Sequence, residues 1–308
     1  MGGSTVNSRA IKSLFGRACF LAALFAVSGC AELSYSAEEP IIPAVTSTRT
    51  SLLDMPDPKS RIDVAVYEFE DLTGQFKPSE GFQTLSKAVS QGGGSVLIKA
   101  LRDTGRGDWF RVVERSNLNN LLQERRIIQE MRQIYLGEEQ VNPNALPPML
   151  FAGTIVEGGV VGYDSNVVTG GAGAALLGVG ARTEYRRDSM SVNLRAVSVK
   201  TGEVLASVVV QKSILSTSVG TNVFRYIETD EILELEAGIT NNEPGLIALT
   251  KAIEKAVYSL IMEMANRELW GFKNPHVGRN LVNQYLEEDG RLDRSEVSDQ
   301  KMGDGKTS

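Results

Sequence analysis

The chain has 308 residues, 42% of them hydrophobic, which is enough for a large folded domain with its own core. It carries a formal net charge of −6 and contains one histidine, His276, and two cysteines, Cys19 and Cys30. Zinc sites and serine–histidine or cysteine–histidine nucleophiles require more such residues, so the composition argues against these chemistries. The acidic balance, with no long basic run, also argues against a nucleic-acid partner.

The first segment of the chain has the pattern of an export signal. Arg9, Lys12 and Arg17 give it a basic start. Residues 18–27 then form an apolar run that is too short to cross a bilayer as a helix. The run ends in Val27-Ser28-Gly29-Cys30, which resembles the cleavage site of bacterial lipoproteins. We therefore expect residues 1–29 to be removed.

Cys30 is then predicted to carry the membrane anchor. The resemblance implies an S-diacylglycerol group on its sulfur and an N-acyl group on its amine, and we expect no other cofactor and no metal. Several acyl chains anchor a protein stably, whereas one chain is marginal. Ala31, which is not acidic, favours the outer membrane of a Gram-negative bacterium. The alternative is an ordinary secretory signal followed by a coincidental cysteine.

The next part of the chain predicts a tether and then an α/β domain. Residues 30–60 are rich in Pro, Ser and Thr, which is typical of an extended tether. Residues 61–164 alternate between strand and helix patterns, which predicts a periplasmic α/β domain with helices packed on a mixed sheet. The expected strands are 62–70, 109–114 and 150–156, and the expected helices lie around 96–101 and after Ser116 as N-cap.

The central region has a different composition. Ser165 to Tyr185 is rich in glycine and small residues, and Lys212 to Ile232 alternates loosely between apolar and polar positions. This alternation is typical of transmembrane β-hairpins, although edge strands of soluble sheets look similar. Residues 186–211 predict a periplasmic hairpin around a Gly-containing turn. Residues 233–273 predict a core helix region that begins at Glu243-Pro244, and residues 274–308 a charged, disordered tail.

Taken together, these segments resemble the curli secretion channel family of outer-membrane lipoproteins (CsgG-like), from the lipobox to about Phe272. The resemblance implies a ring of identical subunits, nine in that family. Each subunit would give its two hairpins to a barrel of about 36 strands, the size of the largest known barrels. The residues that carry the resemblance are Asp71-Leu72-Thr73-Gly74-Gln75-Phe76-Lys77-Pro78, Ala88-Val89, Glu114-Arg115, Asn119-Asn120-Leu121-Leu122, Glu157-Gly158, Gly162-Tyr163-Asp164-Ser165-Asn166, Gly170-Gly171, Gly178-Val179-Gly180-Ala181, Val192-Asn193-Leu194-Arg195, Thr201-Gly202-Glu203, Val223-Phe224-Arg225 and Asn242-Glu243-Pro244.

The resemblance also implies a pore constriction, formed by a loop within residues 74–94. The family places aromatic and amide side chains there, whereas this chain has Phe82 as the aromatic residue, with Thr84 and Leu85 where an Asn-Phe pair is expected. We predict that Phe82, Thr84 and Leu85 line the constriction. A ring of apolar side chains can exclude folded protein and pass an extended chain. Alternatively, Phe82 packs the loop against the sheet.

Two other functions compete with the channel. An enzyme would use Gly92-Gly93-Gly94 as a phosphate cradle, but no Gly-Lys-Ser/Thr motif follows, so we expect no enzymatic activity. A periplasmic adaptor or anchoring lipoprotein without a pore is the stronger alternative. For the channel, the expected partners are further copies of the chain, the outer membrane, secreted amyloid subunits or adhesin and holdfast-anchor subunits, and periplasmic and surface accessory proteins.

Overall fold

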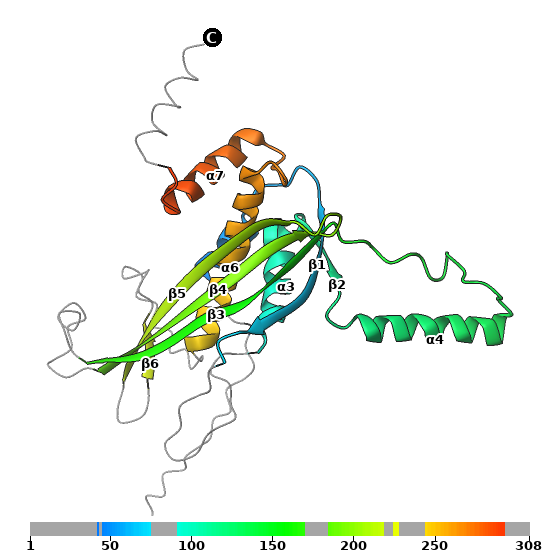
Figure 1. Ribbon diagram of the computed structural model, residues 1–308, viewed down its shortest axis with the longest axis horizontal. Helices are drawn as coiled ribbons and strands as arrows, with labels where there is room; N and C mark the ends of the chain where they lie inside the picture. The colour runs from blue at the N-terminus through cyan, green and yellow to red at the C-terminus, as the bar shows by residue number, and fades with distance from the viewer. Residues whose placement is uncertain are drawn as a thin grey trace, which may run out of the picture. The chain divides into compact units, whose positions relative to one another are not determined.

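Six strands form one sheet within the residues that the computed structural model describes, which are 42, 45–74, 91–169, 184–218, 224–227 and 244–292. Their order across the sheet is β2-β1-β3-β4-β5-β6 (Figure 1). All of them lie in the second of two units into which the chain divides, Met1–Ala44 and Val45–Ser308. The strands are β1 (Ile62–Asp71), β2 (Phe110–Glu114), β3 (Thr154–Thr169), β4 (Glu184–Ser198), β5 (Val204–Ser218) and β6 (Phe224–Ile227).

The sheet is mixed, as the sequence predicts. Strand β1 pairs in parallel with both β2 and β3, whereas β3, β4, β5 and β6 follow one another in antiparallel pairs. The turn at residues 199–203 joins β4 to β5, which confirms the expected hairpin around Lys200-Thr201-Gly202-Glu203. Gly202 has a φ of 74°, a left-handed conformation that glycine adopts without steric strain.

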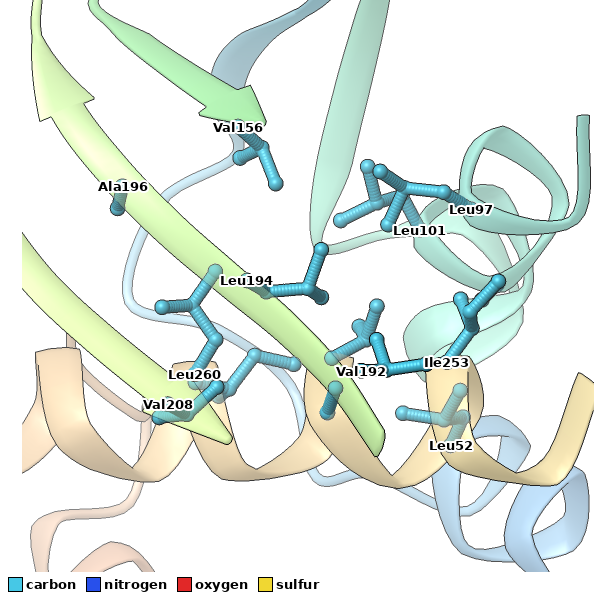
Figure 2. Packing of buried hydrophobic residues seen from close by; sticks show 14 of the residues in the cluster. Leu52, Leu97, Leu101, Val156, Val192, Leu194, Ala196, Val208, Ile253 and Leu260 are labelled. Carbon is cyan, nitrogen blue, oxygen red and sulfur yellow. The ribbon is translucent and has the colours of Figure 1, made fainter. Parts of the chain in front are cut away.

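The core lies between the sheet and the helices α3 (Gly93–Asp103) and α6 (Pro244–Asn266). Alternate residues of β4 point to these helices, as the period of a strand requires. Figure 2 shows Val192 and Leu194 of β4 beside Ile253 of α6 and Leu97 of α3. All four side chains are fully buried. Burial of one such side chain contributes about 1.5–3 kcal/mol, so this layer stabilises the unit.

Helix α6 confirms the predicted C-terminal core helix and begins at Pro244. Proline is tolerated at the first helical position because the amide there has no partner within the helix. The fully buried Leu249, Ala252 and Ile253 lie three to four residues apart in the pattern of one helix face. The helix packs against β4 and β5. Among the described residues, no helix has both the length and the hydropathy needed to cross a bilayer.

Part of the predicted tether is helical. Helix α2 (Ser47–Leu53) lies inside the interval 30–60, and Thr46 caps it by accepting a hydrogen bond from the Arg49 amide at 3.0 Å. The hydroxyl of Thr48 donates to the buried Glu254 carboxylate of α6 at 2.6 Å, and Leu52 is fully buried. The expectation of an extended segment up to residue 60 is therefore wrong, because these contacts attach its second half to the core.

The predicted disordered tail also contains a helix. Helix α7 (Pro275–Glu288) is capped by Asn274, whose side chain accepts hydrogen bonds from the amides of His276 and Val277. Val282 and Tyr285 are buried where α7 packs against α6. The prediction of disorder is wrong for residues 275–288, because a capped apolar face outweighs the high charge. Residues 293–308 lie outside the described part of the chain.

Two local predictions need correction around helix α4 (Leu118–Leu136). Its N-cap is Asn117, not Ser116, whose hydroxyl instead donates to the main-chain carbonyl of Tyr67. None of its residues is buried. The strand expected at 150–156 begins later, at Thr154, and continues through Ser165 into the segment that we expected to open a separate hairpin.

Candidate functional site: the projecting strands

Three strands continue beyond the helix-covered part of the sheet, and a fourth, β6, lies beside them there. The pairing of β3 with β4 begins where Thr154 lies opposite Ser198 and ends where Thr169 lies opposite Glu184. It contains one register shift, between Val160 and Gly162. Strand β6 pairs with β5 only at this far end, where Leu215 lies opposite Ile227 and Ser218 opposite Phe224. Figure 1 shows β3, β4 and β5 passing the end of α6 toward β6. We refer to residues 166–169, 184–187, 215–218 and 224–227 as the projecting strands.

The covered part of the sheet ends at a buried pair. Asp188 of β4 and Ile214 of β5 are register partners, and both are at most 4% exposed. The Tyr163 hydroxyl donates to Asp188 Oδ1 at 3.1 Å. A buried carboxylate requires such hydrogen bonds, because leaving one unsatisfied costs several kcal/mol. The next residue toward the projecting end, Arg187, is exposed.

Two lysines lie at the same level. Lys212 of β5 pairs in register with Met190 and lies close enough to Lys251 of α6 for the two positive charges to repel each other. Burial lowers the pKa of Lys251, the positive charge of Lys212 lowers it further, and the Glu254 carboxylate opposes both effects. Tyr163, Asp188, Lys212 and Lys251 thus form a polar layer where the apolar core stops. The sequence did not lead us to predict this layer, although Asp188 and Lys212 are ionisable residues at core-facing strand positions and could have indicated it.

The structure places only some of the predicted site residues. Ser165 lies in β3 opposite Asp188, Tyr185 in β4 opposite Thr217, and Lys212 in β5. Both intervals predicted as hairpins therefore contain antiparallel strand pairs, and Leu215 and Ile227, expected on the same parity, are register partners. The following predicted residues lie outside the described part of the chain: Cys30, Phe82, Thr84, Leu85 and Ile232.

The glycine run at 92–94 has a packing role. Gly92 is the N-cap of α3, and a Cβ atom added to Gly93 would lie only 2.3 Å from Cδ1 of Phe69. Real Cβ atoms do not approach that closely, so only glycine lets α3 begin against this ring. Close packing therefore accounts for Gly93 without a phosphate ligand.

The fold and the projecting strands define a class of protein. It is an α/β protein whose mixed sheet carries helices on one face and extends at one end into consecutive antiparallel strands. The family model of the curli production assembly/transport component CsgG matches residues 45–288. The chain belongs to the CsgG family. This family is one of transport components, in agreement with the interpretation that the chain is not an enzyme.

Curated relatives agree with this assignment. The chain is 41% identical over 270 residues to the curli production assembly/transport component CsgG of Escherichia coli K12, covering 86% of this chain and 95% of the relative. It is 41% identical over 262 residues to the same component of Salmonella typhimurium LT2, covering 84% and 92%. Among solved structures, a PelC dodecamer from Paraburkholderia phytofirmans is similar at 13% identity and a TM-score of 0.26, covering 66% of this chain and 90% of that one.

Proposed function

We propose that copies of this chain form an outer-membrane lipoprotein channel that exports unfolded curli-like, adhesin or holdfast-anchor subunits by diffusion. The observation that carries the proposal is the continuation of β3, β4, β5 and β6 beyond the core as paired strands, in a chain of the CsgG family. Cys30 would hold the lipid anchor, residues 61–164 would stay periplasmic, and the projecting strands would enter the membrane.

Open edges of the projecting strands support an oligomer. Among the described residues, the pairing between β1 and β3 ends at Val160, whose carbonyl accepts a hydrogen bond from the Leu72 amide at 2.9 Å. Beyond Val160, no described strand pairs with that side of β3, and none pairs with the outer side of β6. In lipid, unpaired backbone groups cost several kcal/mol each, and only a closed ring of strands removes them. We propose that β6 of one copy lies beside β3 of the next, in a ring of nine.

Helix α4 gives a second reason for association. Its 19 residues include none that is buried, and Met131, Ile134 and Tyr135 are exposed by 49%, 71% and 73%. Contiguous apolar surface of this kind marks an interaction site. Because a ring already places identical copies side by side, a second copy of the chain is the partner that we propose for this face.

The proposal is tested by a charge in the second hairpin. We expect Val223→Arg to block ring formation, since arginine on a lipid-facing position costs about 2–4 kcal/mol in each subunit. The matched control is Val199→Arg, at an exposed position of the β4–β5 turn. Electron microscopy of the lipidated, detergent-extracted protein should show rings with a central hole for the wild type and the control. Normal rings from Val223→Arg would contradict the placement of this hairpin in lipid.

A separate measurement distinguishes the channel from an adaptor without a pore. Wild-type protein reconstituted into planar bilayers should give stepwise ion currents, whereas an adaptor would give none. Single particles without a central hole, together with the absence of current, would refute the channel.

A further inference from the structure

Two buried charged residues lie one helical turn apart on α6. Lys251 and Glu254 are only 6% and 5% exposed. Residues three positions apart lie on the same side of a helix, so the two side chains are neighbours. A charge is stable in the protein interior only where an opposite charge or hydrogen bonds compensate for the lost water. The groups around this pair therefore indicate what α6 connects.

Glu254 receives its hydrogen bonds from α2. The hydroxyls of Thr46 and Thr48 both donate to its Oε2, at 2.5 Å and 2.6 Å. The Thr46 hydroxyl also accepts from the Arg49 amide at 3.0 Å, so the N-cap of α2 is itself bonded to the Glu254 carboxylate. Hydrogen bonds to an ionised group are about twice as strong as those between neutral groups. Together with the fully buried Leu52, they hold α2 against α6.

Lys251 connects the same pair to the sheet. Burial lowers the pKa of Lys251, and the positive charge of Lys212 on β5 lowers it further, whereas the Glu254 carboxylate opposes both effects. Helix α6 packs against β5, and the projecting part of β5 begins three residues after Lys212. The Glu254 charge thus favours the charged form of Lys251 beside a second lysine, at the level where the apolar core ends.

These contacts form one polar path across α6. It starts at Thr46 and Thr48, passes through Glu254 and Lys251, and ends at Lys212 in the polar layer. If α2 left its place, the buried Glu254 would lose two hydrogen bonds, and its carboxylate would have to find other donors. Lys251 is its neighbour on the helix, so such a change would alter the charges beside Lys212.

We propose that Glu254 is a positioning residue that couples the docking of α2 to the polar layer at the base of the projecting strands. This inference rests on the proposed function, in which Cys30, ahead of α2, carries the anchor and the projecting strands enter the membrane. Its consequence is that the segment following the anchor and the strands in the membrane are attached to one helix, α6. Release of the first would then loosen the base of the second.

Hydrogen exchange of the full-length lipidated protein tests the coupling. Thr48→Val removes one donor to Glu254, keeps the shape of the side chain and leaves the Thr46 cap in place. Exchange of the peptide 45–54, which contains α2, should become about tenfold faster, as expected for one lost hydrogen bond to a charged group. Exchange of the peptide 204–214 of β5 should become about threefold faster, although Thr48 lies on α2. Thr50→Val is the matched control, because the Thr50 hydroxyl is exposed and donates to the Thr46 carbonyl. It should leave both peptides at the wild-type rate.

A second background interrupts the path at Lys251. Lys251→Met has a side chain of similar size without the charge. Adding Thr48→Val to it should still accelerate the α2 peptide but should leave the β5 peptide at the rate of Lys251→Met alone. An unchanged α2 peptide in Thr48→Val, an unchanged β5 peptide, or the same response of β5 in the Lys251→Met background would each overturn the coupling. A wild type that forms no rings would instead refute the channel, whereas the same exchange pattern would still establish the coupling.

Discussion

The same strands have two different environments in this protein. In the helix-covered part of β4, Met190, Val192, Leu194 and Ala196 are at most 1% exposed, because α3 and α6 cover them. In the projecting part, Arg187 is exposed, and the described neighbours are other strands. A strand pattern alone therefore does not say what covers a face. The covered part is stabilised within one chain, whereas the projecting part depends on whatever surrounds it.

The largest effect should come from the covered part. We expect Leu194→Ala to lower the free energy of unfolding by about 2–5 kcal/mol, because it leaves a cavity under α6. The control is Val209→Ala, at a position on β5 that is 65% exposed, where the change should stay within about 0.5 kcal/mol. Urea unfolding followed by tryptophan fluorescence measures both. Equal losses in the two variants would mean that α6 does not cover β4 as described.

A smaller effect is expected at the polar layer between the two parts. Tyr163→Phe removes the hydrogen bond to Asp188, which is only 4% exposed, and should lower the free energy of unfolding by about 1–2 kcal/mol. Tyr67→Phe, at a tyrosine that is 41% exposed, serves as the control. Urea unfolding followed by tryptophan fluorescence measures the free energy of unfolding of both variants. No difference between the two variants would show that Asp188 does not need this donor.

The smallest effect is a pH dependence of the free energy of unfolding, which arises at Asp103 in the covered part. Burial alone would raise the pKa of Asp103, but hydrogen bonds from Lys99 and Arg49 outweigh it and hold the pKa below its ordinary value of 3.8. The Arg49–Asp103 ion pair, 2.8 Å long, connects α2 to α3, whereas the Lys99–Asp103 pair, 2.9 Å long, lies within α3. Since the folded pKa is lowered, the stabilisation is complete above about pH 4 and is lost as the pH falls through the folded value.

The measurement compares unfolding free energies at about pH 5 and about pH 3. The wild type should lose about 1 kcal/mol more than Asp103→Asn over this interval. Asp108→Asn, at an exposed carboxylate outside this ion pair, is the matched control and should follow the wild type. An identical acid response of the wild type and Asp103→Asn would exclude the ion pair as its source.

Much of the covered part could be predicted because its pattern is local. Alternation in Ile62–Glu70 predicted β1, and the apolar spacing from Leu249 onward predicted α6. The helices α2 and α7 could not be predicted from composition, since both lie in charged or Pro-rich segments. Their caps, Thr46 and Asn274, were the signals that outweighed composition.

The candidate site was predictable only in part, for a physical reason. A β-hairpin is visible in a single sequence, but whether its exposed face meets water, lipid or another subunit is decided by partners that the chain does not encode locally. Ser165 marks the difficulty, because the strand containing it begins at Thr154 and passes from one environment to the other without a break.

The turn between β4 and β5 lies at the end of the sheet opposite the projecting strands. It closes on itself through hydrogen bonds from the Gly202 amide to the Ser198 carbonyl and from the Ser198 amide to the Glu203 carbonyl, both 2.8 Å long. Val199 is 53% exposed there. This short connection is therefore a suitable fusion point for a fluorescent reporter or an affinity tag, from which living cells could be imaged while the strands at the other end remain unaltered.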